Sequence, residues 1–119
     1  MANENESKPL AADEILRTAI EIVEKTLAIQ GVRVERVILF GSRAREESMP
    51  ESDYDLYVLT DRDLDFSQRH ALITRIKREL AVLRIPNDIV LRSAQSFNRV
   101  KKIPGNLAFE VAREGVPVS

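Results

Sequence analysis

The chain has 119 residues, which is enough for one domain with a single core and too few for a second. Its 18 Lys and Arg residues nearly balance 19 Asp and Glu residues, and the resulting net charge of −1 provides no basic field for tight, non-specific nucleic-acid binding. The chain contains no cysteine, so disulfides and thiolate metal sites are excluded.

The beginning of the chain is polar and acidic. We expect residues 1–10 to form a disordered tail and residues 11–119 to form a single domain. Neither an apolar signal segment nor an apolar run long enough to cross a membrane is present, which favours a soluble, cytoplasmic protein. Apolar residues recur at helical spacing from Ala12 onward, and Gly31 is typical of a helix end, so the pattern predicts one long amphipathic helix between them.

Strands are predicted where branched and aromatic residues gather, at residues 32–40, 53–60 and 85–91. A polar segment over residues 42–52 separates the first two strands, and its residues 43–47 could form a helical turn. The remaining predicted elements are an acidic turn over 61–65, an amphipathic helix over 66–83, short helices over 93–102 and 107–114, and an edge strand over 116–119.

This order of elements indicates an α/β fold with a small mixed β-sheet and helices packed on it. The link between the first two strands is too short to contain a full crossover helix, so we expect these strands to be antiparallel. Fold class alone does not identify a function, and the argument therefore turns to particular residues.

Gly41 and Ser42 follow the first predicted strand directly. Glycine permits a tight turn and a close approach of backbone to ligand, and the serine hydroxyl and the following N–H groups can donate to phosphate oxygens. Arg43 and Arg45 could add charge-assisted hydrogen bonds to the same phosphates. The sequence therefore suggests a nucleotide-binding turn at the end of this strand.

Asp53 and Asp55 are two residues apart on a predicted strand, so both carboxylates project from one face, about 6.5–7 Å apart along the backbone. Two like charges on one face make sense when cations lie between them, and carboxylate oxygens favour Mg²⁺ or Mn²⁺. Asp88 lies in the third predicted strand among apolar residues, where it needs a partner or a cleft. If that strand lies beside the second, we expect all three aspartates to converge on a two-metal phosphoryl-transfer site.

Together, the Gly-Ser turn, the Asp-x-Asp pair and the later strand aspartate resemble the signature of the polymerase β-like nucleotidyltransferases, above all the minimal nucleotidyltransferases (MNT). The resemblance covers residues 34–91 and extends weakly to the end of the chain. It implies the polymerase β-like fold, ATP or another nucleoside triphosphate as co-substrate, and Asp53, Asp55 and Asp88 as metal-binding and catalytic residues. It assigns Gly41 and Ser42 to the nucleotide phosphates. Many relatives have glycine where this chain has Glu46.

The resemblance also implies an antitoxin of a HEPN/MNT toxin–antitoxin system, which transfers AMP to a HEPN-domain partner protein. Two alternatives remain open at this point. The chain could neutralise such a partner by contact alone, or it could modify a small molecule as the aminoglycoside-modifying nucleotidyltransferases do. The sequence fixes neither the acceptor, nor the preferred base, nor whether the protein forms an oligomer.

One further acidic pattern needs an interpretation. Asp61, Asp63 and Asp65 alternate as ligands of a calcium loop do, but the required glycine and terminal glutamate are missing at the right spacing. We interpret this segment as a solvated turn.

Overall fold

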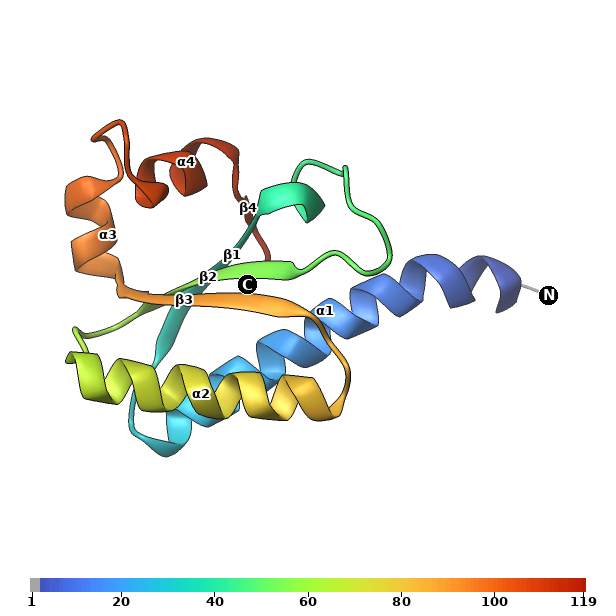
Figure 1. The fold of residues 1–119 in the computed structure, drawn as a ribbon, viewed down its shortest axis with the longest axis horizontal. Helices are drawn as coiled ribbons and strands as arrows, with labels where there is room; N and C mark the ends of the chain where they lie inside the picture. Colours follow the sequence, from blue (N-terminus) through green and yellow to red (C-terminus); the bar gives the residue numbers. More distant parts are fainter. Residues whose placement is uncertain (1–2) are drawn as a thin grey trace.

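The computed structural model describes the backbone of residues 3–119 and the side chains of residues 14–119. It has the α/β architecture expected from the sequence (Figure 1). The elements follow one another as α1 (Asn3–Ile29), β1 (Val34–Phe40), the 3₁₀ turn η1 (Gly41–Arg43), β2 (Tyr54–Thr60), α2 (Phe66–Val82), β3 (Asn87–Ser93), α3 (Ala94–Val100), α4 (Leu107–Glu114) and β4 (Val116–Pro117).

Helix α1 includes most of the segment predicted as a disordered tail. That prediction covers residues 1–10, of which residues 1 and 2 and all the side chains lie outside the described part of the chain. None of the helices in the described part combines the length and the apolar character that a bilayer crossing requires.

The four strands form one mixed sheet in the order β3-β2-β1-β4. Strands β1 and β2 are antiparallel, which confirms the prediction made from the short link between them. Strand β3 runs parallel to β2, and α2 provides the crossover that a parallel pair needs. The short strand β4 pairs antiparallel with β1 at the opposite edge, as expected for the end of the chain.

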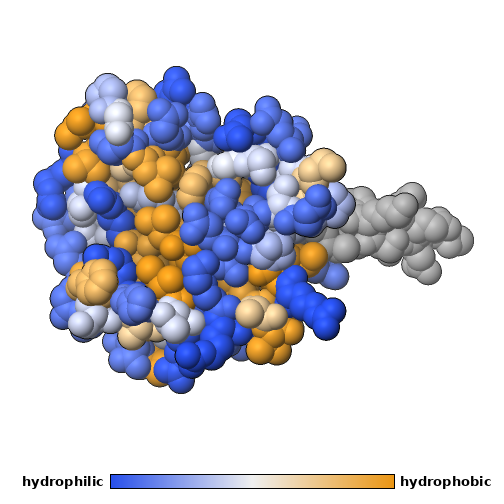
Figure 2. All heavy atoms as spheres, viewed as in Figure 1, coloured by the Kyte–Doolittle hydropathy of each residue, from blue (hydrophilic) through white to orange (hydrophobic). Residues whose placement is uncertain are grey.

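Alternation along the strands gives the sheet two different faces. On one face, β2 contributes Leu56 and Val58 to the larger core, which α1 and α2 cover. On the other face, Tyr57 and Leu59 join a smaller core beneath α3 and α4. Figure 1 shows α1 and α2 on one side of the sheet and α3 and α4 on the other, and Figure 2 shows apolar residues gathered in the middle of this view, where β3 lies.

Strand β3 begins two residues later than the sequence suggests, at Asn87 rather than Ile85. Ile85 instead takes part in the turn that ends α2, because its N–H donates to the Leu80 carbonyl. Pro86 has no N–H to give to a sheet, although its carbonyl accepts a hydrogen bond from Tyr54 N–H at 2.9 Å.

Candidate active site

Asp55 and Asp88 lie side by side on neighbouring strands. In the parallel register of β2 and β3, Asp55 pairs with Asp88, so both side chains emerge from the same face of the sheet. The second and third strands are therefore neighbours, which is the condition on which the sequence analysis made the approach of Asp88 depend. Asp53 is exposed and lies directly before β2, two residues from Asp55. The acidic residues separated by more than thirty positions in the sequence are thus gathered at one end of the sheet.

Gly41 brings the turn after β1 against this acidic group. Phe40 pairs with Asp55 across the antiparallel strands, so the next residue, Gly41, lies beside the Asp55 carboxylate. A Cβ atom at Gly41 would overlap the Asp55 Oδ2 atom and lie 3.0 Å from its Cγ. The backbone of Gly41 also has φ of +76°, in the left-handed region that favours glycine. Both the space and the backbone angle therefore require glycine here.

The charges in this group act on one another. Burial raises the pKa of the Asp55 carboxyl above its ordinary value, and the nearby charges of Asp88 and then Asp53 raise it further. The cations Arg45 and Arg43 act in the opposite direction. The folded chain therefore holds several carboxylates near one another against their repulsion, an arrangement that a bound cation would relieve.

The donor set suits a divalent cation, because carboxylate oxygens are the ligands that Mg²⁺ and Mn²⁺ prefer. Within the described part of the chain, however, no three His, Cys, Asp or Glu side chains stand close enough together to hold a metal ion. The convergence of all three aspartates on a metal therefore stays a prediction. Their oxygen chemistry and the shared register of Asp55 and Asp88 fit a metal that would draw them together.

The segment after Gly41 carries the other candidate residues. Ser42 is half-buried, and its carbonyl accepts a hydrogen bond from Glu47 N–H at 2.9 Å. Arg45 is exposed and forms an ion pair with Glu47 at 3.0 Å. Glu46 is also exposed, and its φ of +60° lies in the left-handed region. This backbone angle favours glycine, which has no Cβ, so the position is strained for Glu46 irrespective of its charge.

Arg43 is engaged in a way that the sequence does not suggest. Its guanidinium donates to the carbonyls of Ser52, Met49 and Pro50 and to the Ser48 hydroxyl. These acceptors all belong to the link between β1 and β2. The sequence predicts that this arginine binds phosphates, whereas in the structure its guanidinium donates to the chain's own loop. No local signal marks the difference, because the acceptors are backbone atoms that only the folded loop brings together.

Tyr54 lies between Asp53 and Asp55 in the sequence, and its side chain points to the face of the sheet opposite to that of Asp55. Its ring is buried in the larger core, as expected from the alternation of the strand. The Arg43 guanidinium lies over this ring, 3.8 Å from the centroid. The sequence did not predict this contact between Tyr54 and Arg43.

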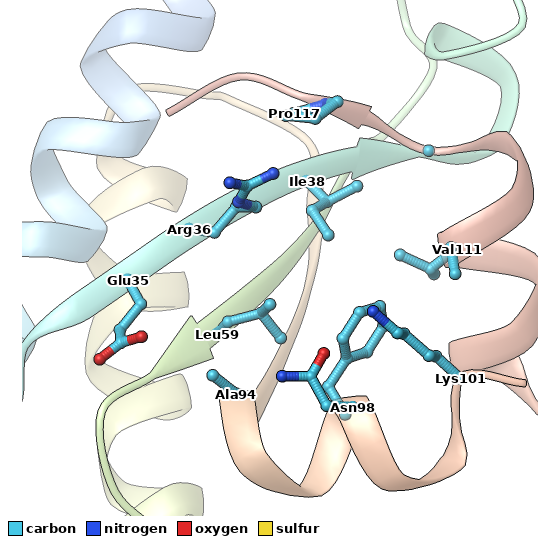
Figure 3. Close-up of a pocket in the computed structure, with 12 residues that line it drawn as sticks. Glu35, Arg36, Ile38, Leu59, Ala94, Asn98, Lys101, Val111 and Pro117 are labelled. Atoms are coloured by element: carbon cyan, nitrogen blue, oxygen red, sulfur yellow. The ribbon is translucent and has the colours of Figure 1, made fainter.

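A groove of about 460 Å³ lies on the same face of the sheet as Asp55, but at the other end (Figure 3). Ile38 from β1, Leu59 from β2 and Val111 from α4 line it, together with Lys101, the residue directly after α3. Tyr57, two residues after Asp55, is buried and lies between the acidic group and the groove. The groove is therefore separate from the aspartates.

The family model described as polymerase beta, nucleotidyltransferase matches residues 20–118. The chain therefore belongs to this nucleotidyltransferase family. The matched segment contains the turn at Gly41 as well as all three candidate aspartates.

A solved structure shares the fold. A crystal structure of a mutant of the toxin–antitoxin MntA-HpeT has a TM-score of 0.55 at 18% identity, over 85% of this chain and 69% of that chain. A crystal structure of a toxin–antitoxin with AMP-PNP has a TM-score of 0.47 at 21% identity, over 71% of this chain and 59% of that chain. None of the curated proteins compared with the chain matches it.

Proposed function

We propose that this domain transfers a nucleoside monophosphate, AMP from ATP, to a hydroxyl group on a HEPN-type partner protein and thereby acts as an antitoxin. The observation that carries the proposal is the pairing of Asp55 with Asp88, with Gly41 against the Asp55 carboxylate. Membership of the nucleotidyltransferase family supports the reaction type. The fold shared with a toxin–antitoxin structure supports the choice of partner.

In the proposed reaction, the turn after β1 binds the triphosphate and the aspartates bind the metal. The N–H groups of Ser42 and Arg43 and the Ser42 hydroxyl donate to the triphosphate, since the N–H groups of residues 44–47 already donate within the turn, and Arg45 adds a positive charge. Asp53 and Asp55 would hold the Mg²⁺ or Mn²⁺ that accompanies the nucleotide, and Asp88 would complete the set on the acceptor side. The bound metal would neutralise the triphosphate charge and favour ionisation of the acceptor hydroxyl.

The reaction is an in-line displacement at the α-phosphorus. The acceptor oxygen forms a bond to this phosphorus, the bond to the bridging oxygen breaks, and pyrophosphate leaves. Asp88 takes the proton of the acceptor hydroxyl. Its exposed position at the start of β3 leaves it open to an acceptor that approaches from solvent.

A second candidate function is neutralisation of the partner by contact alone. Two observations favour it. Among the described side chains, no group of three His, Cys, Asp or Glu residues that could hold a metal is found, and an acidic residue, Glu46, occupies a left-handed position four residues after Ser42. Under this alternative, the acidic group would be a remnant of the family's site.

One variant separates the two functions. Asp88→Asn keeps the size of the side chain and removes its charge, so contacts with the partner survive. We expect transfer from labelled ATP to the HEPN partner to fall by about 10²–10⁴-fold, as when a general base is lost. The toxin would then regain its activity. Asp63→Asn, an exposed aspartate in the turn before α2, serves as the control.

Neutralisation that survives in Asp88→Asn would establish masking by contact. Full transfer by the same variant would show that the catalytic carboxylate is another residue.

A further inference from the structure

We infer that Arg43 is a positioning residue, which braces the loop between β1 and β2 and thereby sets the place of the Asp53 carboxylate. The inference rests on the proposed function in one respect only, namely that Asp53 serves the nucleotide's metal. The brace itself is a matter of contacts within this chain.

The guanidinium of Arg43 uses both of its edges on the loop. Nε and Nη2 donate to the same carbonyl, that of Ser52, at 3.1 and 2.9 Å. Nη2 also donates to the carbonyls of Pro50 at 3.1 Å and Met49 at 3.3 Å. Nη1 reaches the Ser48 hydroxyl at 3.5 Å, the longest of these contacts. A single planar group thus holds three successive portions of the loop.

These contacts enclose Asp53 from both directions along the chain. The residue before it, Ser52, gives its carbonyl to Arg43 twice. The residue after it, Tyr54, gives its ring to the same guanidinium. Tyr54 is in turn fixed to the protein, since its ring is buried and its N–H donates to the Pro86 carbonyl. The backbone of Asp53 therefore lies between two residues, Ser52 and Tyr54, that both contact the guanidinium of Arg43.

The brace also joins the two halves of the candidate site. Arg43 belongs to the η1 turn that begins with Gly41 and Ser42, and its contacts lie at the other end of the loop, next to Asp53. A displacement of the turn at Gly41 and Ser42 would therefore also move Asp53. Among the described residues, no ion pair engages the Arg43 side chain, so the loop carbonyls and the Tyr54 ring are its partners.

Lysine cannot replace arginine in this role. Its ammonium group is a point charge without the planar fork, so it cannot donate twice to the Ser52 carbonyl while lying flat on the Tyr54 ring. The variant Arg43→Lys keeps the charge and removes the geometry. Arg113→Lys is a matched control, because Arg113 lies on α4, contacts Glu110 and Glu114 at the surface, and lies over the Phe109 ring.

The first measurement is hydrogen exchange of the amides of residues 44–54 in the metal-free protein. We expect faster exchange there in Arg43→Lys, with exchange in α1 and α2 unchanged, and wild-type exchange throughout in Arg113→Lys. The second measurement is the binding of Mn²⁺ with ATP, followed by the electron paramagnetic resonance of free Mn²⁺. We expect about 10–100-fold weaker binding in Arg43→Lys, the range for groups that orient metal ligands.

A third measurement separates positioning from a general loss of stability. Guanidinium ion at millimolar concentration, added to Arg43→Ala, should restore part of the Mn²⁺ binding, because it can occupy the space between the Ser52 carbonyl and the Tyr54 ring. If the variant were merely destabilised, guanidinium would make binding worse. That result, or unchanged exchange over residues 44–54 in Arg43→Lys, would overturn the inference.

Direct binding of phosphate by Arg43 gives a different pattern, which would also overturn it. Arg43→Lys would then lose affinity for metal-free pyrophosphate while exchange in the loop stayed at the wild-type rate. Failure of the proposed function remains distinguishable from both cases. It would appear as an absence of Mn²⁺ binding in the wild type, and the exchange measurement would still decide whether Arg43 braces the loop.

Discussion

At the scale of single residues, two glycines show how the same backbone angle serves different ends. Gly31 and Gly41 have φ of +75° and +76°, so both use the left-handed region. Gly31 ends α1, and a Cβ there would meet no atom within 4 Å. Gly41 lies against the Asp55 carboxylate, and a Cβ there would displace it. The first glycine is required by the backbone alone, and the second also by the site.

This pair provides a prediction with its own control. Gly31→Ala and Gly41→Ala should each lower the free energy of unfolding by about 1–2 kcal/mol, the cost of the left-handed region for a residue with a Cβ. Only Gly41→Ala should also abolish the binding of ATP with Mg²⁺, because Asp55 must move. Urea denaturation and calorimetry measure the two effects. Equal loss of ATP binding in both variants would refute the proposed contact with Asp55.

Glu46 presents the opposite case, a left-handed position that lacks the glycine. Glu46→Gly should raise the free energy of unfolding by up to about 1 kcal/mol, since relief of about 1–2 kcal/mol of strain is partly offset by the greater freedom of glycine in the unfolded chain. Glu46→Gln removes the charge and keeps the strain, so it should leave the urea midpoint near that of the wild type. If Gln stabilises as much as Gly, the charge and not the backbone is the cause.

At the scale of elements, the acidic turn before α2 has a structural role. Asp65 is the N-cap of α2, and its side chain accepts from Gln68 N–H at 2.8 Å. The Gln68 side chain accepts in return from Asp65 N–H at 3.1 Å, which completes a capping box. Asp61 accepts from Arg33 N–H at 3.1 Å, at the opposite end of the same turn. The segment interpreted as a solvated turn thus also caps α2 and binds the residue directly before β1.

The cap can be tested within the same turn. Asp65→Ala should lower the free energy of unfolding by about 0.5–2 kcal/mol, because α2 loses the acceptor for an otherwise free N–H. Asp63→Ala, at an exposed aspartate two residues earlier, should change it by less than about 0.5 kcal/mol. Thermal unfolding followed by circular dichroism compares the two. A similar loss in both variants would assign the effect to the charge of the turn rather than to the cap.

Helices α1 and α2 end in the same motif with different residues. The N–H groups of Gly31 and Arg84 each donate to a backbone carbonyl in the last turn of the preceding helix. The N–H of the next residue, Val32 or Ile85, then donates to a leucine carbonyl of the same helix. Arg84 has φ of +57°, so an arginine stands where glycine is usual. Glycine therefore marks the end of the first helix in the sequence, whereas the end of the second helix, expected at residue 83 and found at Val82, was predicted without a glycine.

At the scale of the whole molecule, the topology concentrates charge at one end of the sheet. The parallel pair β2–β3 aligns Asp55 with Asp88, and the antiparallel pair β1–β2 brings Gly41 to them. The repulsion among these aspartates opposes folding, as is common where stability is sacrificed for a site.

The destabilisation caused by gathering these aspartates at one end of the sheet should be measurable. In the absence of divalent cations, Asp88→Asn should raise the free energy of unfolding by about 0.5 kcal/mol, the scale of exposed charge interactions. With Mg²⁺ and ATP present, the order should reverse, because ligand binding stabilises the wild type more. Differential scanning fluorimetry under both conditions tests this. A variant less stable than the wild type without ligand would show that Asp88 supports the fold.

Apart from residues 3–10, which were expected to be disordered and belong to α1, the sequence by itself determined the order and type of the elements, because apolar periodicity and the Gly-Ser turn are local features. It also identified the acidic residues, since Asp-x-Asp after a Gly-Ser turn is recognisable by spacing, and it predicted the antiparallel pairing from the shortness of a link. The tertiary structure alone decided how these parts meet. That Asp88 stands beside Asp55 depends on strand order, and the brace by Arg43 depends on backbone carbonyls that carry no sequence signal. Side-chain patterns are written in the sequence, whereas contacts with the backbone across a loop exist only once the loop has folded.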